Sequence, residues 1–313
     1  MTNNAKKLSP LKNWWIFTQE RFHPVSHFTM LFVFVLFHLL MSNPSKRLDE
    51  IQLINGLFLY LGVVVFYYKL RLYDEIKDYE LDCVINPHRP LPRGLLFHRD
   101  LYLGIVLCLI FEQIFFSRFG QNAVFLLVIA QVYSLIMYKE FFIRDIIRPH
   151  LTTYAVLHTV VTSFLTFAIL GALKDQNILE AYIDRDNSLM ALNNWLLFNV
   201  FEFGRKTYAT EEERAGVDTY SSLFTPFGAF LLQLIQTGLS SFCIFTLFYH
   251  SEMTLLRKDF LIIGLLFIQI IFMLISALYL STNLVRWAKI YRSFSEIYIV
   301  LVFLFMLALI IFT

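Results

Sequence analysis

Nine long apolar stretches run through the sequence, and they constrain the fold more than any other feature. A helix needs ~20 mostly apolar residues to cross the hydrocarbon core of a bilayer. We place such stretches near residues 26–43, 52–70, 100–118, 121–138, 151–173, 189–206, 222–249, 259–281 and 293–312. No segment alternates as the strands of a membrane barrel do, and backbone polar groups in lipid must be satisfied internally. The sequence therefore predicts an all-α polytopic membrane protein with nine transmembrane helices in one bundle.

The composition agrees with this class of protein. Hydrophobic residues make up 58% of the chain and charged residues 16%, and the mean hydropathy is +0.61, whereas soluble domains average ~25% charged residues. The formal net charge of +2 argues against a nucleic-acid partner, and the three cysteines have no zinc or disulfide spacing. We expect a single membrane-embedded domain over residues 1–313, with the bundle from about residue 24 and a cytoplasmic or interfacial segment over residues 1–23.

The distribution of basic residues predicts the orientation. If the N-terminus is cytoplasmic, most of the 26 Lys and Arg residues fall on the cytoplasmic side, as the positive-inside rule requires. The two most charged connections, 71–99 and 205–221, then also face the cytoplasm. We expect a multi-pass protein of the cytoplasmic (inner) membrane. The sixth stretch departs most from an apolar pattern, because Asn193, Asn194 and Glu202 interrupt it.

The segment that follows the second apolar stretch is rich in carboxylates. Five of them fall close together, at Asp74, Glu75, Asp78, Glu80 and Asp82. On one continuous helix, Glu75, Asp78 and Asp82 share a face, and Asp74 lies one turn from Asp78. Like charges on one face repel, so a bound cation would stabilise the arrangement. Oxygen ligands beside a phosphate favour Mg²⁺.

A plainer interpretation remains open for this segment. It could be a solvated helix end whose charge is compensated by Lys77 and Arg71. Its position next to the bilayer favours a functional role, because ionisable groups near membrane depth are costly and tend to be used.

The segment resembles the first signature of the UbiA superfamily of intramembrane prenyltransferases, NDxxDxxxD followed by an Asn, an Arg-Pro-Leu and a Gly. Asp74 takes the Asn position, and Glu75, Asp78 and Asp82 take the three Asp positions. The trailing part is matched by Asn86, Arg89, Pro90, Leu91 and Gly94. The resemblance extends over essentially the whole chain, because the family also has nine spans.

A second acidic motif, which the family carries after the sixth span, is matched by residues 202–217. Glu202 takes its first acidic position, one of Glu211, Glu212 and Glu213 a later one, and Gly216-Val217 follows. Arg205 and Lys206 are additions to the family pattern. Taken alone, Glu202 and Lys206 could be an ordinary i,i+4 ion pair worth ~0.3–0.5 kcal/mol.

The resemblance implies an activity and a set of site residues. It implies a Mg²⁺-dependent transfer of an isoprenyl group from a prenyl diphosphate to a lipophilic acceptor, an aromatic ring being the commonest, in contact with membrane lipid. The implied metal ligands are Asp74, Glu75, Asp78, Asp82, Glu202 and Glu212, the implied diphosphate contacts are Arg89, Tyr138, Lys139, Arg205 and Lys206, and the implied catalytic groups are Asp78, Asp82 and Lys206. For Tyr138 and Lys139, positive-inside sorting alone is a sufficient explanation.

The alternatives to prenyl transfer are another reaction of the UbiA superfamily, a transporter and a CDP-alcohol phosphotransferase. The superfamily also includes phosphoribosyl transfer to a polyprenyl phosphate, ether-lipid synthesis and terpene cyclisation. A transporter would place carboxylates near the midplane of broken helices, whereas these lie at span ends. A CDP-alcohol phosphotransferase would need a DG-x-x-AR pattern, which the sequence lacks.

Overall fold

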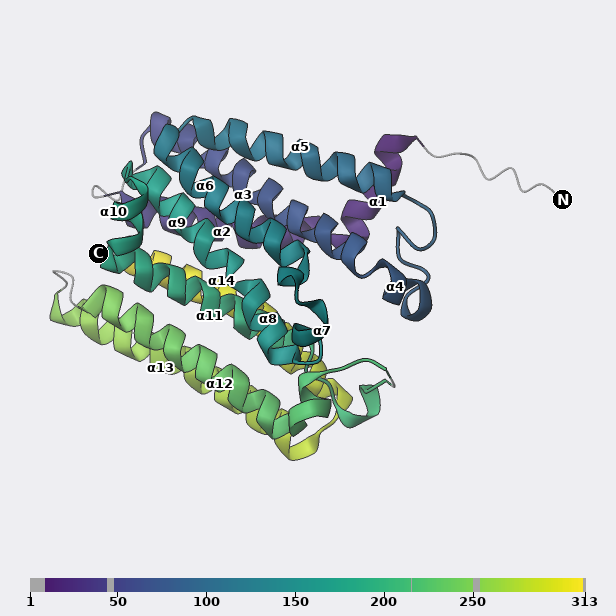
Figure 1. The fold of residues 1–313 in the computed structure, drawn as a ribbon. Coiled ribbons are helices and arrows are strands. Elements are labelled where there is room, and N and C mark those ends of the chain that lie inside the picture. The colour runs from purple at the N-terminus through teal and green to yellow at the C-terminus, as the bar shows by residue number, and fades with distance from the viewer. Residues whose placement is uncertain (1–8, 44–47, 215, 250–253, 312–313) are drawn as a thin grey trace.

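The computed structural model describes residues 9–43, 48–214, 216–249 and 254–311, and within them it contains helices and no strand. Figure 1 shows long helices running side by side as a bundle. In chain order the elements are α1 (Pro10–Arg21), α2 (Pro24–Ser42), α3 (Glu50–Lys77), α4 (Tyr79–Ile85), α5 (His98–Ser117), α6 (Gln121–Tyr138), the 3₁₀ turn η1 (Glu140–Phe142), α7 (Arg144–Ile147), α8 (Leu151–Thr159), α9 (Val161–Lys174), α10 (Ile178–Ile183), α11 (Arg185–Arg205), the 3₁₀ turn η2 (Thr210–Glu212), α12 (Tyr220–Tyr249), α13 (Leu255–Thr282) and α14 (Val285–Ile311).

Eight helical segments of the described chain are long and apolar enough to cross a membrane, and they confirm the prediction of an all-α multi-pass membrane protein. They are α2, α3, α5, α6, the pair α8 and α9, α12, α13 and α14. The predicted sixth span forms α11, which is 21 residues long but is absent from this apolar set. The predicted count of nine spans is therefore not confirmed.

The polar character of α11 follows from its place inside the bundle. It packs against α9, α12 and α14, so its amides meet other helices. The Asn194 amide nitrogen donates to His38 Nε2 at 2.9 Å and to Thr166 Oγ1 at 2.8 Å, and Ser240 donates to Asn193 at 2.7 Å. Hydrogen bonds between helices of this kind stabilise membrane bundles. A helix surrounded in this way does not need the apolar surface of a lipid-facing span.

One end of the bundle collects the short elements that position charged side chains. Figure 1 shows α1, α4 and α7 at the end away from α10. Both α3 and α11 end there, at Lys77 and Arg205. The side chains around these two helix ends belong to distant parts of the sequence, and the bundle brings them to one place.

We expect Gly204→Ala to destabilise the protein, because α11 and α14 meet closely at this glycine. A Cβ atom at Gly204 would lie 2.2 Å from the Cβ atom of Ser295, so the helices would have to separate. Overpacking of this kind costs about 1–3 kcal/mol of unfolding free energy. Thermal unfolding in detergent micelles measures the change.

The matched control for this substitution is Gly238→Ala. A Cβ atom at Gly238 in α12 would meet nothing within 4 Å, and Ala is favoured over Gly inside a helix by about 0.5–1 kcal/mol. Equal melting temperatures for the two variants would contradict the close approach of α11 and α14.

Candidate functional site

The first acidic group lies where α3 ends. Asp74 accepts from Lys77 Nζ at 3.1 Å and has the guanidinium of Arg71 at 3.6 Å. Asp78 follows the last residue of α3, and its side chain is 36% exposed. Its described ion pair is a long one, 3.9 Å to Arg148. Asp74 and Asp78 therefore form a carboxylate pair one turn apart, with Asp78 the less engaged member.

The single helix face predicted for Glu75, Asp78 and Asp82 is wrong, because α3 ends at Lys77 and α4 begins at Tyr79. Asp82 therefore belongs to a separate short helix. The chain changes direction at Asp78, between the helix that carries Asp74 and Glu75 and the helix that carries Asp82.

Arginine side chains form ion pairs with Glu75 and Asp82 of the first motif. Glu75 is 1% exposed and pairs with Arg21 of α1, and Arg71 lies 3.3 Å from the same carboxylate. Asp82 pairs with Arg89. Asn86 also donates to Asp82 at 3.0 Å. The structure thus pairs Arg89, a predicted diphosphate contact, with Asp82, a predicted metal ligand.

The second acidic group lies where α11 ends. Both oxygens of Glu202 accept from Arg205, at 2.5 Å from Nε and 2.9 Å from Nη2. The ammonium of Lys206 is 3.7 Å from Glu202 Oε1. Glu212, which the sequence places with this group, instead binds Arg292 of α14 in a double contact at 2.7 and 2.9 Å.

Lys206 connects the two groups. Burial lowers the pKa of Lys206, and the charges of Glu202, Arg205, Asp78 and Lys77 also act on that pKa. Carboxylates from the ends of α3 and α11 thus lie within electrostatic reach of one ammonium. The two helix ends are separated by more than 120 residues in the sequence, yet charges from both act on the pKa of Lys206.

The electrostatics of Asp78 fit a carboxylate that a cation would stabilise. Burial raises the pKa of Asp78 above its usual value, and the negative charges of Asp74 and Asp82 raise it further. Lys77 and Arg148 oppose the rise. A repelled carboxylate next to another carboxylate gains most from an added positive charge.

Aromatic and imidazole groups of α8 complete the site. The ring of Tyr154 stacks on His158 with centroids 3.9 Å apart, and the Lys77 ammonium lies 5.3 Å from the Tyr154 ring. His158 Nδ1 donates to the Tyr154 carbonyl at 2.6 Å, which leaves Nε2 as an acceptor, and that atom has no partner among the described residues. The sequence motifs did not include Tyr154 or His158 among the site residues. The i,i+4 spacing of Tyr154 and His158 on a predicted span is the signal that could have located this pair of stacked side chains.

The loop after α6 contributes residues other than the two predicted ones. Tyr138 stacks on Tyr73 with centroids 4.8 Å apart, and the exposed Lys139 ammonium lies 4.8 Å from the Tyr138 ring. Instead, Glu140 and Arg148 carry the ionic contacts, with Arg148 Nε 2.6 Å from Glu140 Oε1. Through Arg148 the loop reaches Asp78.

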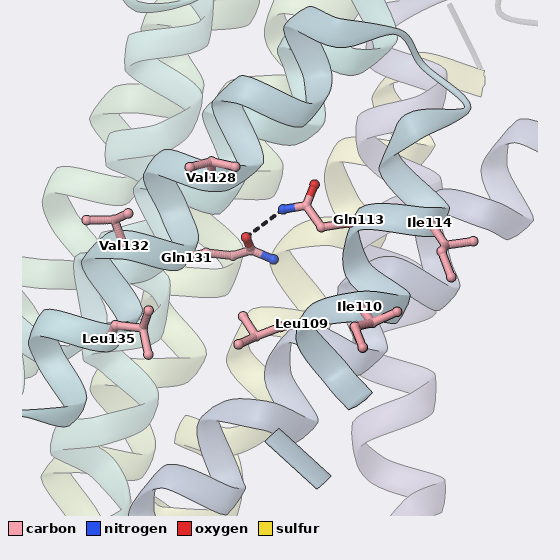
Figure 2. A pocket seen from close by; sticks show the side chains of 8 residues that line it. All are labelled: Leu109, Ile110, Gln113, Ile114, Val128, Gln131, Val132 and Leu135. Atoms are coloured by element: carbon pink, nitrogen blue, oxygen red, sulfur yellow. Dashed lines mark hydrogen bonds between the residues drawn. The ribbon is translucent and has the colours of Figure 1, made fainter. Parts of the chain in front are cut away.

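A separate groove of about 480 Å³ lies between α5 and α6, away from these charges. Figure 2 shows Gln113 donating to Gln131 inside it, at 2.7 Å, among aliphatic side chains. Its lining contains none of the predicted site residues.

Only part of the predicted ligand set fits a Mg²⁺ ion. In the described part of the chain, no three Asp, Glu, His or Cys side chains come close enough together to hold a metal. Mg²⁺ needs fewer, since one or two carboxylates, waters and substrate phosphates suffice. Asp78 fits that donor set, because its described ion pair is long, whereas Asp74 next to it already contacts Lys77 and Arg71. Both oxygens of Glu202 already accept from Arg205, so Glu202 does not.

Comparison with known proteins defines the fold. No family model and no curated protein matches the sequence. A solved structure from work on digeranylgeranylglyceryl phosphate synthase is similar, with a TM-score of 0.63 and 16% identity over 98% of this chain and 100% of that one. The apo structure of a UbiA homologue from Aeropyrum pernix K1 is also similar, with a TM-score of 0.60 and 13% identity over 87% of this chain and 95% of that one. The predicted UbiA-like fold is confirmed.

Proposed function

We propose that this chain, built on the UbiA-type fold, is an intramembrane prenyltransferase that moves an isoprenyl group from a prenyl diphosphate to a lipophilic acceptor. The proposal is carried by the charged ends of α3 and α11, where the Lys206 ammonium lies 3.7 Å from Glu202 and the charge of Asp78 acts on the pKa of that ammonium. Carboxylates mixed with a surplus of cations suit a ligand that is itself highly anionic.

In prenyl transfer, the main task of the protein is to neutralise the diphosphate leaving group. The allylic C–O bond breaks to give an allyl cation and a diphosphate, whose developing charge is stabilised by preorganised cations. Lys77, Arg148, Arg205 and Lys206 supply those cations here. Mg²⁺, when bound at Asp78 next to Asp74, would supply Lewis-acid neutralisation of the same leaving group. The surrounding bundle keeps the allyl cation away from water.

The acceptor is the point on which two candidates differ. The family resemblance favours an aromatic ring. The likeness to a structure of digeranylgeranylglyceryl phosphate synthase favours, as the second candidate, a lipid hydroxyl that would become an ether. Prenyl transfer to either acceptor uses the same diphosphate site.

The orientation completes the proposal. We place the ends of α3 and α11 at the cytoplasmic face, where a soluble prenyl diphosphate headgroup is accessible, because the basic residues gather there. The whole chain then acts as one membrane-embedded domain.

Mass spectrometry of lipid extracts tests the function. Membranes that contain the protein are incubated with prenyl diphosphates of several lengths and Mg²⁺, with membranes lacking the protein as the control. We expect a covalent prenyl adduct, whose fragmentation identifies an aromatic or an ether linkage. Free diphosphate with a cyclic hydrocarbon would indicate a cyclase instead. Cation flux into liposomes without any prenyl diphosphate would indicate a transporter.

A further inference from the structure

The ends of α3 and α11 carry side-chain pairs with the same spacing but different charge. Asp74 and Asp78 are four residues apart, as are Glu202 and Lys206. This spacing puts the two members of a pair one turn apart on the same side of a helix. The α3 pair is acid and acid, whereas the α11 pair is acid and base. At the α3 end, Lys77 and Arg71 contact Asp74, and Asp78 keeps a long described ion pair of 3.9 Å. At the α11 end, both oxygens of Glu202 are engaged.

The contacts of Glu202 show that neighbouring cations already compensate its negative charge. Arg205 contacts both carboxylate oxygens, at 2.5 and 2.9 Å, and Lys206 lies 3.7 Å from one of them. The Glu202 side chain is 14% exposed, so screening by water is weak and these attractions are strong. A divalent ion at Glu202 would have to displace both cations or lie against them.

We propose that Arg205 and Lys206 take the place of a second divalent cation, so that a substrate diphosphate is held by one Mg²⁺ at the end of α3 together with fixed side-chain cations at the end of α11. The two side chains carry two positive charges, the charge of one Mg²⁺. A guanidinium binds phosphate oxygens in a fork, and an ammonium acts as a compact point charge. Glu202 then orients these cations and holds no metal. The inference rests on the proposed function, because that function makes the ligand a diphosphate.

Counting bound metal ions tests this inference directly. The full chain in detergent micelles is titrated with Mn²⁺ in the presence of inorganic diphosphate and followed by electron paramagnetic resonance. We expect one Mn²⁺ per wild-type chain and no spin-coupled pair. Lys206→Asp creates a second i,i+4 acid pair, and we expect two Mn²⁺ with spin coupling. A coupled pair in the wild-type chain would overturn the inference.

Diphosphate binding without metal provides the second measurement. With a chelator present, calorimetry should detect binding of inorganic diphosphate to the wild-type chain. Lys206→Gln should weaken that binding roughly tenfold or more, because a charge-assisted contact is lost. Lys289→Gln removes the same charge from an exposed site on α14 and should leave the affinity unchanged. Equal affinity in Lys206→Gln and the wild-type chain would refute the role of Lys206.

The outcomes separate this inference from the proposed function. Prenyl product with two coupled Mn²⁺ in the wild-type chain would leave the function standing and remove the inference. If the wild-type chain binds one Mn²⁺, binds diphosphate without metal and forms no prenyl product, the inference stands and the proposed function is removed. Should Lys206→Asp fail to fold, the Lys206→Gln calorimetry and the wild-type Mn²⁺ count still decide the question.

Discussion

The Asp78→Asn variant is expected to lose prenyl transfer by at least about 100-fold in kcat, the typical effect of removing one preorganised electrostatic group. The amide keeps the shape of the side chain but removes the charge that would help hold Mg²⁺ at the end of α3. The fold should persist, because Asp78 makes no side-chain cap to α4 and its described ion pair to Arg148 is 3.9 Å long. Product formation in nanodiscs, followed by mass spectrometry, measures the loss.

Asp145→Asn is the matched control. Asp145 is an exposed carboxylate of α7 at the same end of the bundle, and the same change of charge there should leave kcat within about twofold of wild type, since exposed charges contribute little. Wild-type turnover by Asp78→Asn at ordinary Mg²⁺ concentrations would remove the α3 end from the proposed site.

The apolar stretches predicted the helices well, and their ends less well. The last span was expected to begin near residue 293, yet α14 begins at Val285. The basic residues Arg286, Lys289 and Arg292 lie before the predicted start of the span. Long basic side chains can nevertheless lie along a helix and reach water or a partner. Arg292 does so through its contact with Glu212. The stretch 151–173 was expected to be one helix and is divided at Val160 into α8, which ends at Thr159, and α9, which begins at Val161.

Local spacing predicted the parts of the site that depend on one helix turn. The pair Asp74 and Asp78 and the pair Glu202 and Lys206 are both of this kind. The pairing of Glu75 with Arg21 was not predictable, because it depends on how α1 packs against α3. Tertiary contacts of this kind have no signature in a sequence read one segment at a time.

A buried ion pair between α3 and α5 shows the same limit inside the bundle. Lys69 and Glu112 lie on different helices, 43 residues apart, and both side chains are 0% exposed. Lys69 Nζ donates to Glu112 Oε2 at 2.7 Å, and Gln131 donates to the same oxygen at 2.8 Å. In the sequence, Lys69 reads as one more basic residue at the end of a span. The packing of α3 against α5 makes it a buried ion pair.

Lys69→Met is therefore expected to lower the free energy of unfolding by about 3–5 kcal/mol, the typical cost of leaving one member of a buried ion pair without its partner. The packed interior of the bundle offers Glu112 no water in exchange. Thermal or denaturant unfolding in detergent micelles measures the change. Lys289→Met is the control, because Lys289 is exposed on α14 and exposed charges contribute at most about 1 kcal/mol.

The double variant Lys69→Met/Glu112→Leu separates the pair from its parts. Removing both charges leaves an apolar contact of similar volume, which is typically neutral or stabilising by about 1–4 kcal/mol relative to the ion pair. Gln131 loses its acceptor on Glu112, so we expect the double variant to regain most, and not all, of the stability that Lys69→Met loses. If Lys69→Met instead unfolds no more easily than Lys289→Met, the two charges do not depend on each other. If the double variant is stable but no longer transfers prenyl groups, the pair acts on the charged end of α3 as well as on the packing of α3 against α5.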